Sequence, residues 1–182
     1  SSPLLQQNFP MVGGGPDLCI LLRHGTPVPE EDDAARPLSS QGRSEAESTA
    51  KGIAAYLERL PEGCPTVQVV HSGKLRAQQT AEAVASAIAE FASSCEASGG
   101  LNPNDDPELA EETLTSSSAA VVIVVGHLPH MGKFAAKLTG SLAAAGRLGG
   151  LFHPAGGLVL KRTSDGWSEG AEIATGETWW ER

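Results

Sequence analysis

The 182-residue sequence has few cysteines, and none of them are paired in a motif. Cys19, Cys64 and Cys95 lie far apart and form no CxxC pair, which argues against the common zinc sites and against a disulfide framework. We therefore expect a protein of a reducing compartment that holds no metal and no cofactor.

Positive charge is scarce as well. Thirteen Lys and Arg residues stand against 22 Asp and Glu, and the formal net charge is −9. A nucleic-acid partner is not expected, because phosphate backbones are bound by clustered Lys and Arg. Any small anionic ligand must instead be held by a few local arginines.

Long apolar runs are missing too. None approaches the length of about 20 residues that spans a bilayer, and the N-terminus has no charged region followed by an apolar block. The sequence therefore predicts a soluble protein without a membrane partner. Its location is expected to be the cytoplasm, or the interior of a plastid or mitochondrion if a targeting segment has been removed.

Aromatic residues make up only 4% of the chain, whereas hydrophobic residues make up 40%. This composition predicts a globular interior of Ala, Val, Leu and Ile. The length fits one core better than two. We expect a flexible Gly- and Pro-rich lead-in over residues 1–16, then a single domain over residues 17–182 that acts as a monomer.

Strand patterns alternate with helix patterns along the chain. Apolar, β-branched runs predict buried strands at 17–25, 66–73 and in the segment 116–127, each followed by a helix-forming stretch. Ser39 or Ser40 is expected to cap the first helix, and Asp105 or Asp106 a later helix with Pro107 in its first turn. Residues 141–150 are expected to form a flexible connection.

The order of these segments defines the fold class. Strands that alternate with helices predict an α/β protein, with a mostly parallel central sheet flanked by helices as a three-layer sandwich. Two short strand-like segments around Ser164–Gly166 predict a C-terminal hairpin.

Three of the predicted strands end in residues that can carry chemistry. The first ends in Arg23 and His24, the second leads into Ser72 and Arg76, and the third ends in His127. In an open α/β sheet the ligand crevice lies beyond the carboxyl ends of the strands, so these side chains are expected to converge.

This set of residue types suits phosphoryl transfer. Guanidinium groups bind phosphate oxygens bidentately, and a neutral imidazole can attack phosphorus and carry the phosphoryl group. Gly25 and Gly126 would let the backbone approach the anion. Each residue alone is more simply explained as a surface charge or a structural histidine, and the joint pattern carries the hypothesis.

Three motifs also carry a family resemblance. The segments LLRHGT, HSGKLRAQQTAE and VVIVVGHLPHMGK together resemble the histidine phosphatase, or phosphoglycerate-mutase-like, superfamily. The segment ARPLSSQGRSEA, the short chain and GHLP are similar to its SixA-type branch of small phosphohistidine phosphatases. The resemblance runs from about Asp17 to the final hairpin and implies a phosphoglycerate-mutase-like fold.

The resemblance implies a role for each matching residue. His24 would be the phosphorylated nucleophile, Arg23 and Arg76 would bind the phosphoryl group, and His127 would be the second histidine of the pocket. Arg36 would contribute to the same pocket. The remaining expected substrate contacts are Gly25, Thr26, Ser72 and His130, whereas Arg43 and His71 are more simply explained as a solvated charge and a structural histidine.

A leaving-group acid, which many relatives supply, has no clear position in this sequence. The carboxylates of residues 30–33 and those of Asp105, Asp106 and Glu108 fit solvated loops or helix caps better than catalysis. The SixA-type enzymes that this chain resembles also lack a dedicated leaving-group acid. The absence of such an acid suits a phosphohistidine substrate, whose protonated imidazole leaves as a neutral group.

The leading hypothesis is a metal-independent phosphatase that acts on a phosphorylated protein through a phosphohistidine at His24. Two alternatives stay open: a phosphatase of small phosphorylated metabolites, and a catalytically silent module that binds a phosphorylated ligand. A nucleotide-binding domain is disfavoured, because neither GxxxxGK[ST] nor GxGxxG occurs in the chain.

Overall fold

The structure is a computed structural model that describes residues 15–61, 65–91, 94–174 and 179. Residues 1–14 of the expected lead-in and Cys64 lie outside these ranges. None of the helices in the described ranges is both long and apolar enough to cross a membrane.

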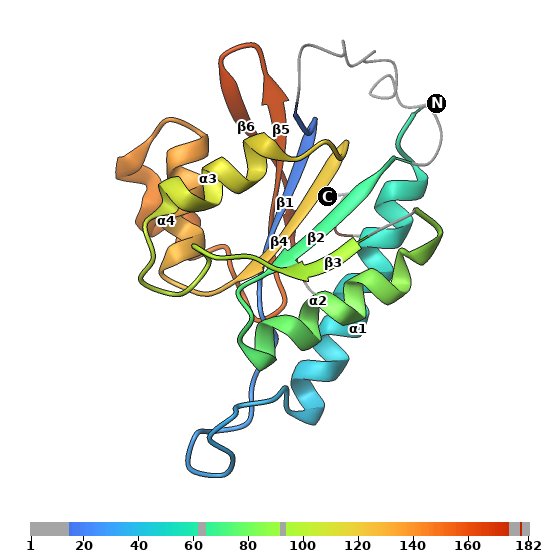
Figure 1. Cartoon of the computed structure of the whole chain (residues 1–182), viewed down its shortest axis with the longest axis vertical. Coiled ribbons are helices and arrows are strands. Elements are labelled where there is room, and N and C mark those ends of the chain that lie inside the picture. The colour runs from blue at the N-terminus through green and yellow to red at the C-terminus, as the bar shows by residue number, and fades with distance from the viewer. Residues whose placement is uncertain (1–14, 62–64, 92–93, 175–178, 180–182) are drawn as a thin grey trace.

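One sheet of six strands runs through the described part of the chain, in the order β3-β2-β4-β1-β5-β6 (Figure 1). Neighbours among β3, β2, β4 and β1 are parallel, whereas β5 and β6 are antiparallel additions. The predicted mostly parallel sheet and the C-terminal hairpin are confirmed. The strands are β1 (Leu18–Arg23), β2 (Val67–His71), β3 (Ser94–Ala97), β4 (Val121–Gly126), β5 (Gly157–Thr163) and β6 (Gly166–Ile173).

Helices cover both faces of this sheet. Helices α1 and α2 lie on one side, and α3 and α4 lie on the other with α5 beside them (Figure 1). This arrangement confirms the three-layer α/β sandwich. The helices are α1 (Ser40–Glu58), α2 (Leu75–Ala87), α3 (Pro107–Ser116), α4 (His130–Leu138) and α5 (Ala145–Gly149), with short 3-10 turns η2 (Ala89–Phe91) and η3 (Leu142–Ala144).

The two apolar layers explain why the central strands are apolar at every position. Ile20 and Leu22 of β1 belong to the cluster under α1 and α2, whereas Cys19 and Leu21 belong to the cluster under α4. Successive side chains of a strand point to opposite faces, so a strand covered on both faces needs apolar residues throughout. All four of these side chains have 0% exposure.

Capping residues set where two helices begin. The Ser39 hydroxyl accepts a hydrogen bond from the Gly42 amide at 3.0 Å and so caps α1. Asp106 does the same for α3 through the Glu108 amide, with Pro107 in the first turn. Each cap therefore lies on one of the two residues that the sequence indicated.

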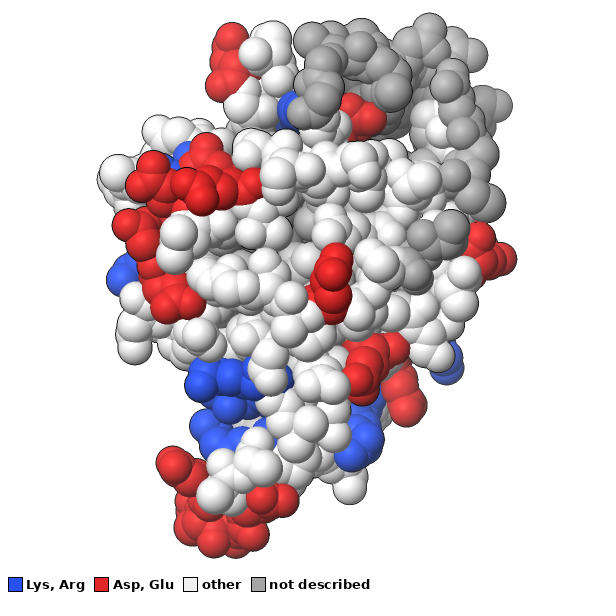
Figure 2. All heavy atoms as spheres, viewed as in Figure 1, with Lys and Arg blue, Asp and Glu red and all other residues white. Residues whose placement is uncertain are grey.

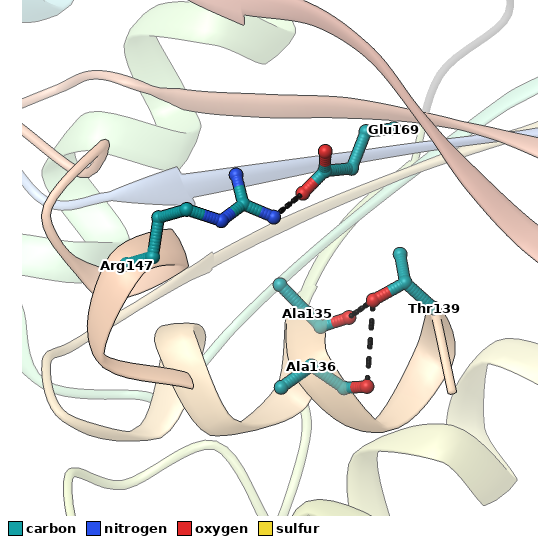
Figure 3. Close-up of polar contacts among 5 residues, drawn as sticks. All are labelled: Ala135, Ala136, Thr139, Arg147 and Glu169. Atoms are coloured by element: carbon teal, nitrogen blue, oxygen red, sulfur yellow. Dashed lines mark hydrogen bonds and ion pairs between the residues drawn. The ribbon is translucent and has the colours of Figure 1, made fainter. Parts of the chain in front are cut away.

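The expected flexible connection at 141–150 is wrong. The segment forms η3 and α5, which pack against α4. Arg147 of α5 forms an ion pair with Glu169 of β6 at 2.6 Å (Figure 3). Just before the segment, the Thr139 hydroxyl donates to the carbonyls of Ala135 and Ala136 at the end of α4. Buried Leu148 secures the segment, because its apolar contacts offset the ordering of a small-residue chain.

Strand register places the ends of three strands at one edge. Arg23 of β1 is paired with Gly126 of β4, and Val125 is paired with His71 of β2. The residues that follow these positions therefore emerge side by side, although the chain separates them by tens of residues.

Candidate active site

Lys and Arg side chains gather near the lower end of the molecule in Figure 2, beside a protruding acidic tip. In the same view, Figure 1 shows the loop between β1 and α1 at this end. That loop carries the exposed residues Glu30, Glu31, Asp32 and Asp33. A positive region of this kind in a chain of net charge −9 is a local feature, suited to holding an anion.

His24 is fixed by its neighbours on both its backbone and its ring. Its amide donates to the Gly126 carbonyl at 3.1 Å, and its own carbonyl accepts from the Ala155 amide at 3.1 Å. Ring atom Nδ1 lies 2.7 Å from the Gly25 carbonyl oxygen. A carbonyl can only accept, so Nδ1 carries the proton and the neutral ring keeps a lone pair on Nε2.

The surroundings of His24 favour that neutral form. Burial lowers the pKa of His24 from 6.5 to about 4, and the charges of Arg76, Arg23 and Arg36 act in the same direction. The hydrogen bond to Gly25 opposes them only in part. With 9% of its surface exposed, His24 is a neutral imidazole near pH 7 that still reaches the edge of the sheet.

His127 lies beside His24, with the two ring centroids 5.0 Å apart. Burial, then the charges of His24, Arg76 and Lys74, lower the pKa of His127 to about 3. Its Nε2 is 2.6 Å from the Ser72 hydroxyl, which also accepts the Lys74 amide at 3.3 Å. Its Nδ1 is buried and has no hydrogen-bond partner in the described part of the chain.

Three arginines surround the pair of histidines. Arg23 donates through Nη1 to the Phe152 carbonyl at 3.2 Å, and Arg36 donates through Nε to the Val28 carbonyl at 3.3 Å. The Nε of Arg76 is buried without a partner, and burial together with the charge of Arg36 lowers the pKa of Arg76. The structure therefore brings Arg23, Arg36 and Arg76 to the same site as His24.

Arg36 has an unusual backbone conformation. Its φ of 48° lies in the left-handed region, which costs a non-glycine residue about 1 kcal/mol or more. The Arg36 amide donates to Asp33 at 3.0 Å, so a tight turn of the loop holds this conformation. Strained backbone of this kind is typical of functional positions.

Gly25 connects the histidine segment to both helices of its layer. The Gly25 amide donates to the buried Thr80 hydroxyl at 3.0 Å, and that hydroxyl donates to the Arg76 carbonyl at 2.8 Å. A Cβ on Gly25 would lie 2.7 Å from the Gly42 carbonyl oxygen of α1. Helix packing therefore requires glycine here, in addition to any close approach to an anion.

Thr26 is engaged with the side chain of Glu45 on α1. Its amide donates to Oε2 and its hydroxyl to Oε1, both at 2.9 Å, and Gln41 also donates to Glu45 at 2.9 Å. This carboxylate therefore anchors the segment that follows His24. Ser72 is likewise engaged, with His127, so both hydroxyls have protein partners.

The other two histidines of interest lie inside the protein. His130 has 0% exposure and packs against Phe134 with ring centroids 5.9 Å apart. The Nδ1 of His71 accepts the Gly73 amide at 3.1 Å. His71 is thus a structural residue, and His130 lies beneath the site surface.

The carboxylates of residues 30–33 and 105–108 interact mainly with an arginine and with turn amides. Glu30 acts on Arg76, whose pKa it raises in opposition to burial. Asp33 accepts the Ala35 amide, and Asp105 accepts the Asn102 amide, as expected for turns. Within the described ranges, no carboxylate is hydrogen-bonded to His24 or His127, and no three of His, Cys, Asp and Glu gather as a metal site.

Three supporting residues escaped the sequence reasoning. Lys74 lies two positions after Ser72 in a short loop, which could have drawn attention to it. Thr80 lies one helical turn after Arg76, and Glu45 lies on α1 with no motif around it. Their roles depend on contacts between segments, such as the Gly25–Thr80 bond across 55 residues of sequence.

The chain is similar to known phosphatases in sequence and in fold. No family model matches it. The phosphohistidine phosphatase SixA of Escherichia coli (strain K12) is 33% identical over 126 residues, which cover 65% of this chain and 72% of that protein. A SixA protein of Agrobacterium tumefaciens has a similar structure, with a TM-score of 0.68, 24% identity, and coverage of 87% of this chain and 98% of the other.

A second solved structure extends the likeness of fold. The mycobacterial glucosyl-3-phosphoglycerate phosphatase, in complex with VO3, matches with a TM-score of 0.64 and 16% identity. The match covers 87% of this chain and 100% of that one. The SixA-like and phosphoglycerate-mutase-like architecture that the motifs implied is thereby confirmed.

Proposed function

The chain belongs to the SixA-type branch of the histidine phosphatase superfamily and is a phosphatase, and we propose that it hydrolyses protein phosphohistidine, without a metal, through a phosphorylated His24. The relative from E. coli is named a phosphohistidine phosphatase, which is the reason for preferring this substrate class.

The state of the His24 ring carries this proposal. Its Nδ1 proton is held by the Gly25 carbonyl at 2.7 Å, and burial keeps the ring neutral, so Nε2 offers a lone pair. A neutral imidazole is a nucleophile, whereas an imidazolium is not. Arg23, Arg36 and Arg76 act on the same ring and provide the charge that a phosphoryl group needs.

In the first step, Nε2 of His24 attacks phosphorus in line with the P–N bond of the substrate. The electron pair of that bond passes to the substrate nitrogen, and an imidazole protonated on its other nitrogen leaves as a neutral ring. His24 becomes a phosphoimidazolium that keeps its Nδ1 proton. The arginines stabilise the charge spread over the equatorial oxygens during transfer.

In the second step, water attacks the phosphorus of phospho-His24. The P–Nε2 bond breaks, its electron pair returns to Nε2, and inorganic phosphate leaves. The neutral His24 ring is restored with its proton on Nδ1, ready for another turnover. Buried His127, 5.0 Å from His24 between ring centroids, is placed to hold a phosphoryl oxygen in both steps.

The charge of the site supports the proposed metal independence. Three guanidinium groups surround His24 and can neutralise the phosphoryl oxygens, which in other phosphoryl-transfer enzymes is done by metal ions. We expect activity to persist after dialysis against a chelator. A large loss that is restored by a divalent cation would contradict this part of the proposal.

One observation favours a second candidate, a phosphatase of small phosphomonoesters. An alkoxide is a poor leaving group and needs a proton from an acid. Glu30 lies in the loop over the site, close enough to Arg76 to raise the pKa of that guanidinium. If Glu30 protonates an ester oxygen, Glu30→Gln will lower the hydrolysis of alkyl phosphates and leave phosphohistidine hydrolysis unchanged.

The architecture also supports the expected domain and assembly. The six strands and both helical layers share two apolar clusters around one sheet, so we propose a single domain over residues 17–182 that acts as a monomer. Light scattering during gel filtration should give a mass near the 18.8 kDa of one chain.

The proposed intermediate can be tested directly. A phosphohistidine peptide labelled with 32P should leave an acid-labile, alkali-stable label on the wild-type protein after rapid quenching. His24→Asn should accept no label and lose turnover by at least about a thousandfold, because the nucleophile is gone. His153→Asn, at an exposed histidine, is the matched control and should keep both properties.

The same experiment separates catalysis from mere binding. A silent binding module would retain the phosphopeptide without label transfer or phosphate release. Hydrolysis of alkyl phosphates alone would favour the second candidate.

A further inference from the structure

The charges that act most strongly on the two site histidines are all positive. Burial aside, Arg76, Arg23 and Arg36 lower the pKa of His24, and Arg76 and Lys74 lower that of His127. Both histidines are neutral near pH 7, so they do not change the net charge of the site. Glu30, acting on Arg76, offsets only part of this positive charge.

These cationic residues differ in how far they are exposed to solvent. Arg23, Arg36 and Arg76 are half-buried, whereas Lys74 is exposed. Lys74 is the N-cap residue of α2, and its amide donates to the Ser72 hydroxyl, which in turn bonds to His127. Its backbone is therefore two hydrogen bonds from the buried ring, while its side chain starts at the rim.

The Lys74 ammonium is also uncommitted. Among the described residues its side chain has neither a hydrogen-bond partner nor an ion-pair partner. Half-buried Lys137, by contrast, pairs with Glu111 at 3.4 Å. Lys74 thus stands free beside a pocket in which three arginines already serve the phosphoryl group.

We propose that Lys74 is a specificity residue that binds a second anionic group of the substrate, a carboxylate next to the phosphohistidine in the substrate protein. Its place at the rim, outside the three half-buried arginines, fits a group that flanks the phosphoryl group. A flexible ammonium with three donors accommodates carboxylates at varied positions, which suits a side chain on a protein surface.

This inference rests on the proposed function and sharpens its substrate class. An acidic residue beside the phosphohistidine would be met by Lys74, whereas a basic one would face four cations. The preference is expected to be modest, because an exposed ion pair contributes little and is screened by salt.

Matched peptides provide the test. Two peptides carry one phosphohistidine and differ only in Glu or Gln at the positions on either side of it. The wild-type protein should hydrolyse the Glu peptide with a kcat/KM about two- to fivefold higher at low ionic strength. Lys74→Gln should abolish that preference, so that the kcat/KM values for the two peptides become equal.

The control removes the same charge at the other end of the sheet. Exposed Lys161 of β5 is paired with Leu18, the first residue of β1, whereas the site follows the last residue, Arg23. Lys161→Gln should keep the preference. In 0.5 M salt the preference should shrink in the wild-type protein, because the contact is exposed.

Two outcomes would overturn the inference. One is a wild-type protein that hydrolyses both peptides equally. The other is an equal loss on both peptides in Lys74→Gln, which would place Lys74 on the phosphoryl group itself.

Failure of the proposed function has a different signature. If neither peptide is hydrolysed while phosphomonoesters are, the substrate is a small molecule. The comparison is then made between a phosphorylated hydroxy acid and its amide. A preference for the acid that disappears in Lys74→Gln would support the second-anion site from a small-molecule source, and equal rates would overturn it.

Discussion

Strands β1 and β4 change character between their bodies and their carboxyl ends. Residues 18–22 and 121–125 are apolar and buried, and they pair along the full register. The next positions are Arg23 with His24 in one strand, and Gly126 with His127 in the other. Within two residues, each strand passes from the centre of the core to the chemistry of the site.

The contrast shows how one sheet serves two purposes. In the strand bodies, every side chain contributes apolar burial, which stabilises the fold. Beyond the strand ends, Nε of Arg76 and Nδ1 of His127 are buried with no hydrogen-bond partner among the described residues. Each such group costs about 1–3 kcal/mol. These groups of the candidate site therefore lower the stability that the apolar strand bodies provide.

Truncation in the strand body should separate stability from activity. Ile123 has 0% exposure at the centre of β4, so Ile123→Ala should lower the free energy of unfolding by about 2–5 kcal/mol. The kcat/KM of the remaining folded protein should stay within about twofold of wild type, because Ile123 belongs to the apolar cluster under α1 and α2. Urea unfolding and phosphate release measure the two effects.

Ile123→Val is the graded control, with an expected loss of about 0.5–1.5 kcal/mol. A large fall in activity of fully folded Ile123→Ala would show that the strand body also positions the site, and the contrast would fail.

A pH series addresses the site end of the comparison. The folded-state pKa of His24 is about 4, below the ordinary value of 6.5, so between these values the unfolded chain binds a proton that the folded chain excludes. The stability that neutral His24 contributes is therefore complete above pH 6.5 and is lost as the pH falls toward 4. The slope amounts to about 1.4 kcal/mol per pH unit for one proton.

His24→Asn removes this titration, and its unfolding free energy should depend less steeply on pH between 4 and 6.5. His153→Asn, at an exposed residue, controls for the loss of a histidine. Parallel curves for His24→Asn and wild type would mean that His24 has the same pKa in the folded and unfolded chains, and would contradict this prediction.

Much of the fold could be predicted from the sequence, and so could the convergence of side chains at the candidate site. Continuous apolar runs indicated strands covered on both faces, and Ser39 and Asp106 act as the caps that their residue types favour. The convergence of His24 with His127 followed from where their strands end. These features are local, or they depend on one general rule of α/β sheets.

The supporting contacts could not be read in this way. Thr80 bonds to Gly25 across 55 residues of sequence, and Glu45 bonds to Thr26 from a helix whose docking angle no motif encodes. Residues 141–150 looked flexible because of their Ala and Gly content, and only the packing of Leu148 against the α4 layer makes them helical.

Thr80 offers a prediction at the junction between core and site. Its hydroxyl joins the Gly25 amide to the Arg76 carbonyl and has 0% exposure. Thr80→Val keeps the shape but leaves the Gly25 amide unpaired, so stability should fall by about 1–3 kcal/mol. Activity should fall about tenfold or more, because His24 and Arg76 lose their common anchor. Thr80→Ser retains the hydroxyl and should restore most of both.

The smallest expected effect concerns the tautomer of His127, which depends on a hydrogen bond within the site. The Ser72 hydroxyl lies 2.6 Å from Nε2 of His127, and we expect it to donate its proton there, which leaves the His127 proton on Nδ1. Ser72→Ala should shift the nitrogen NMR signals of His127 toward a mixture of tautomers and lower kcat several-fold.

Unfolding free energy should change little in Ser72→Ala, because Ser72 is only half-buried, and Ser72→Thr should preserve the wild-type tautomer. A variant that kept both the tautomer and the rate would show that His127 is oriented without Ser72. A different group would then have to orient His127. Its Nδ1, which has no hydrogen-bond partner among the described residues, would be the first atom to examine.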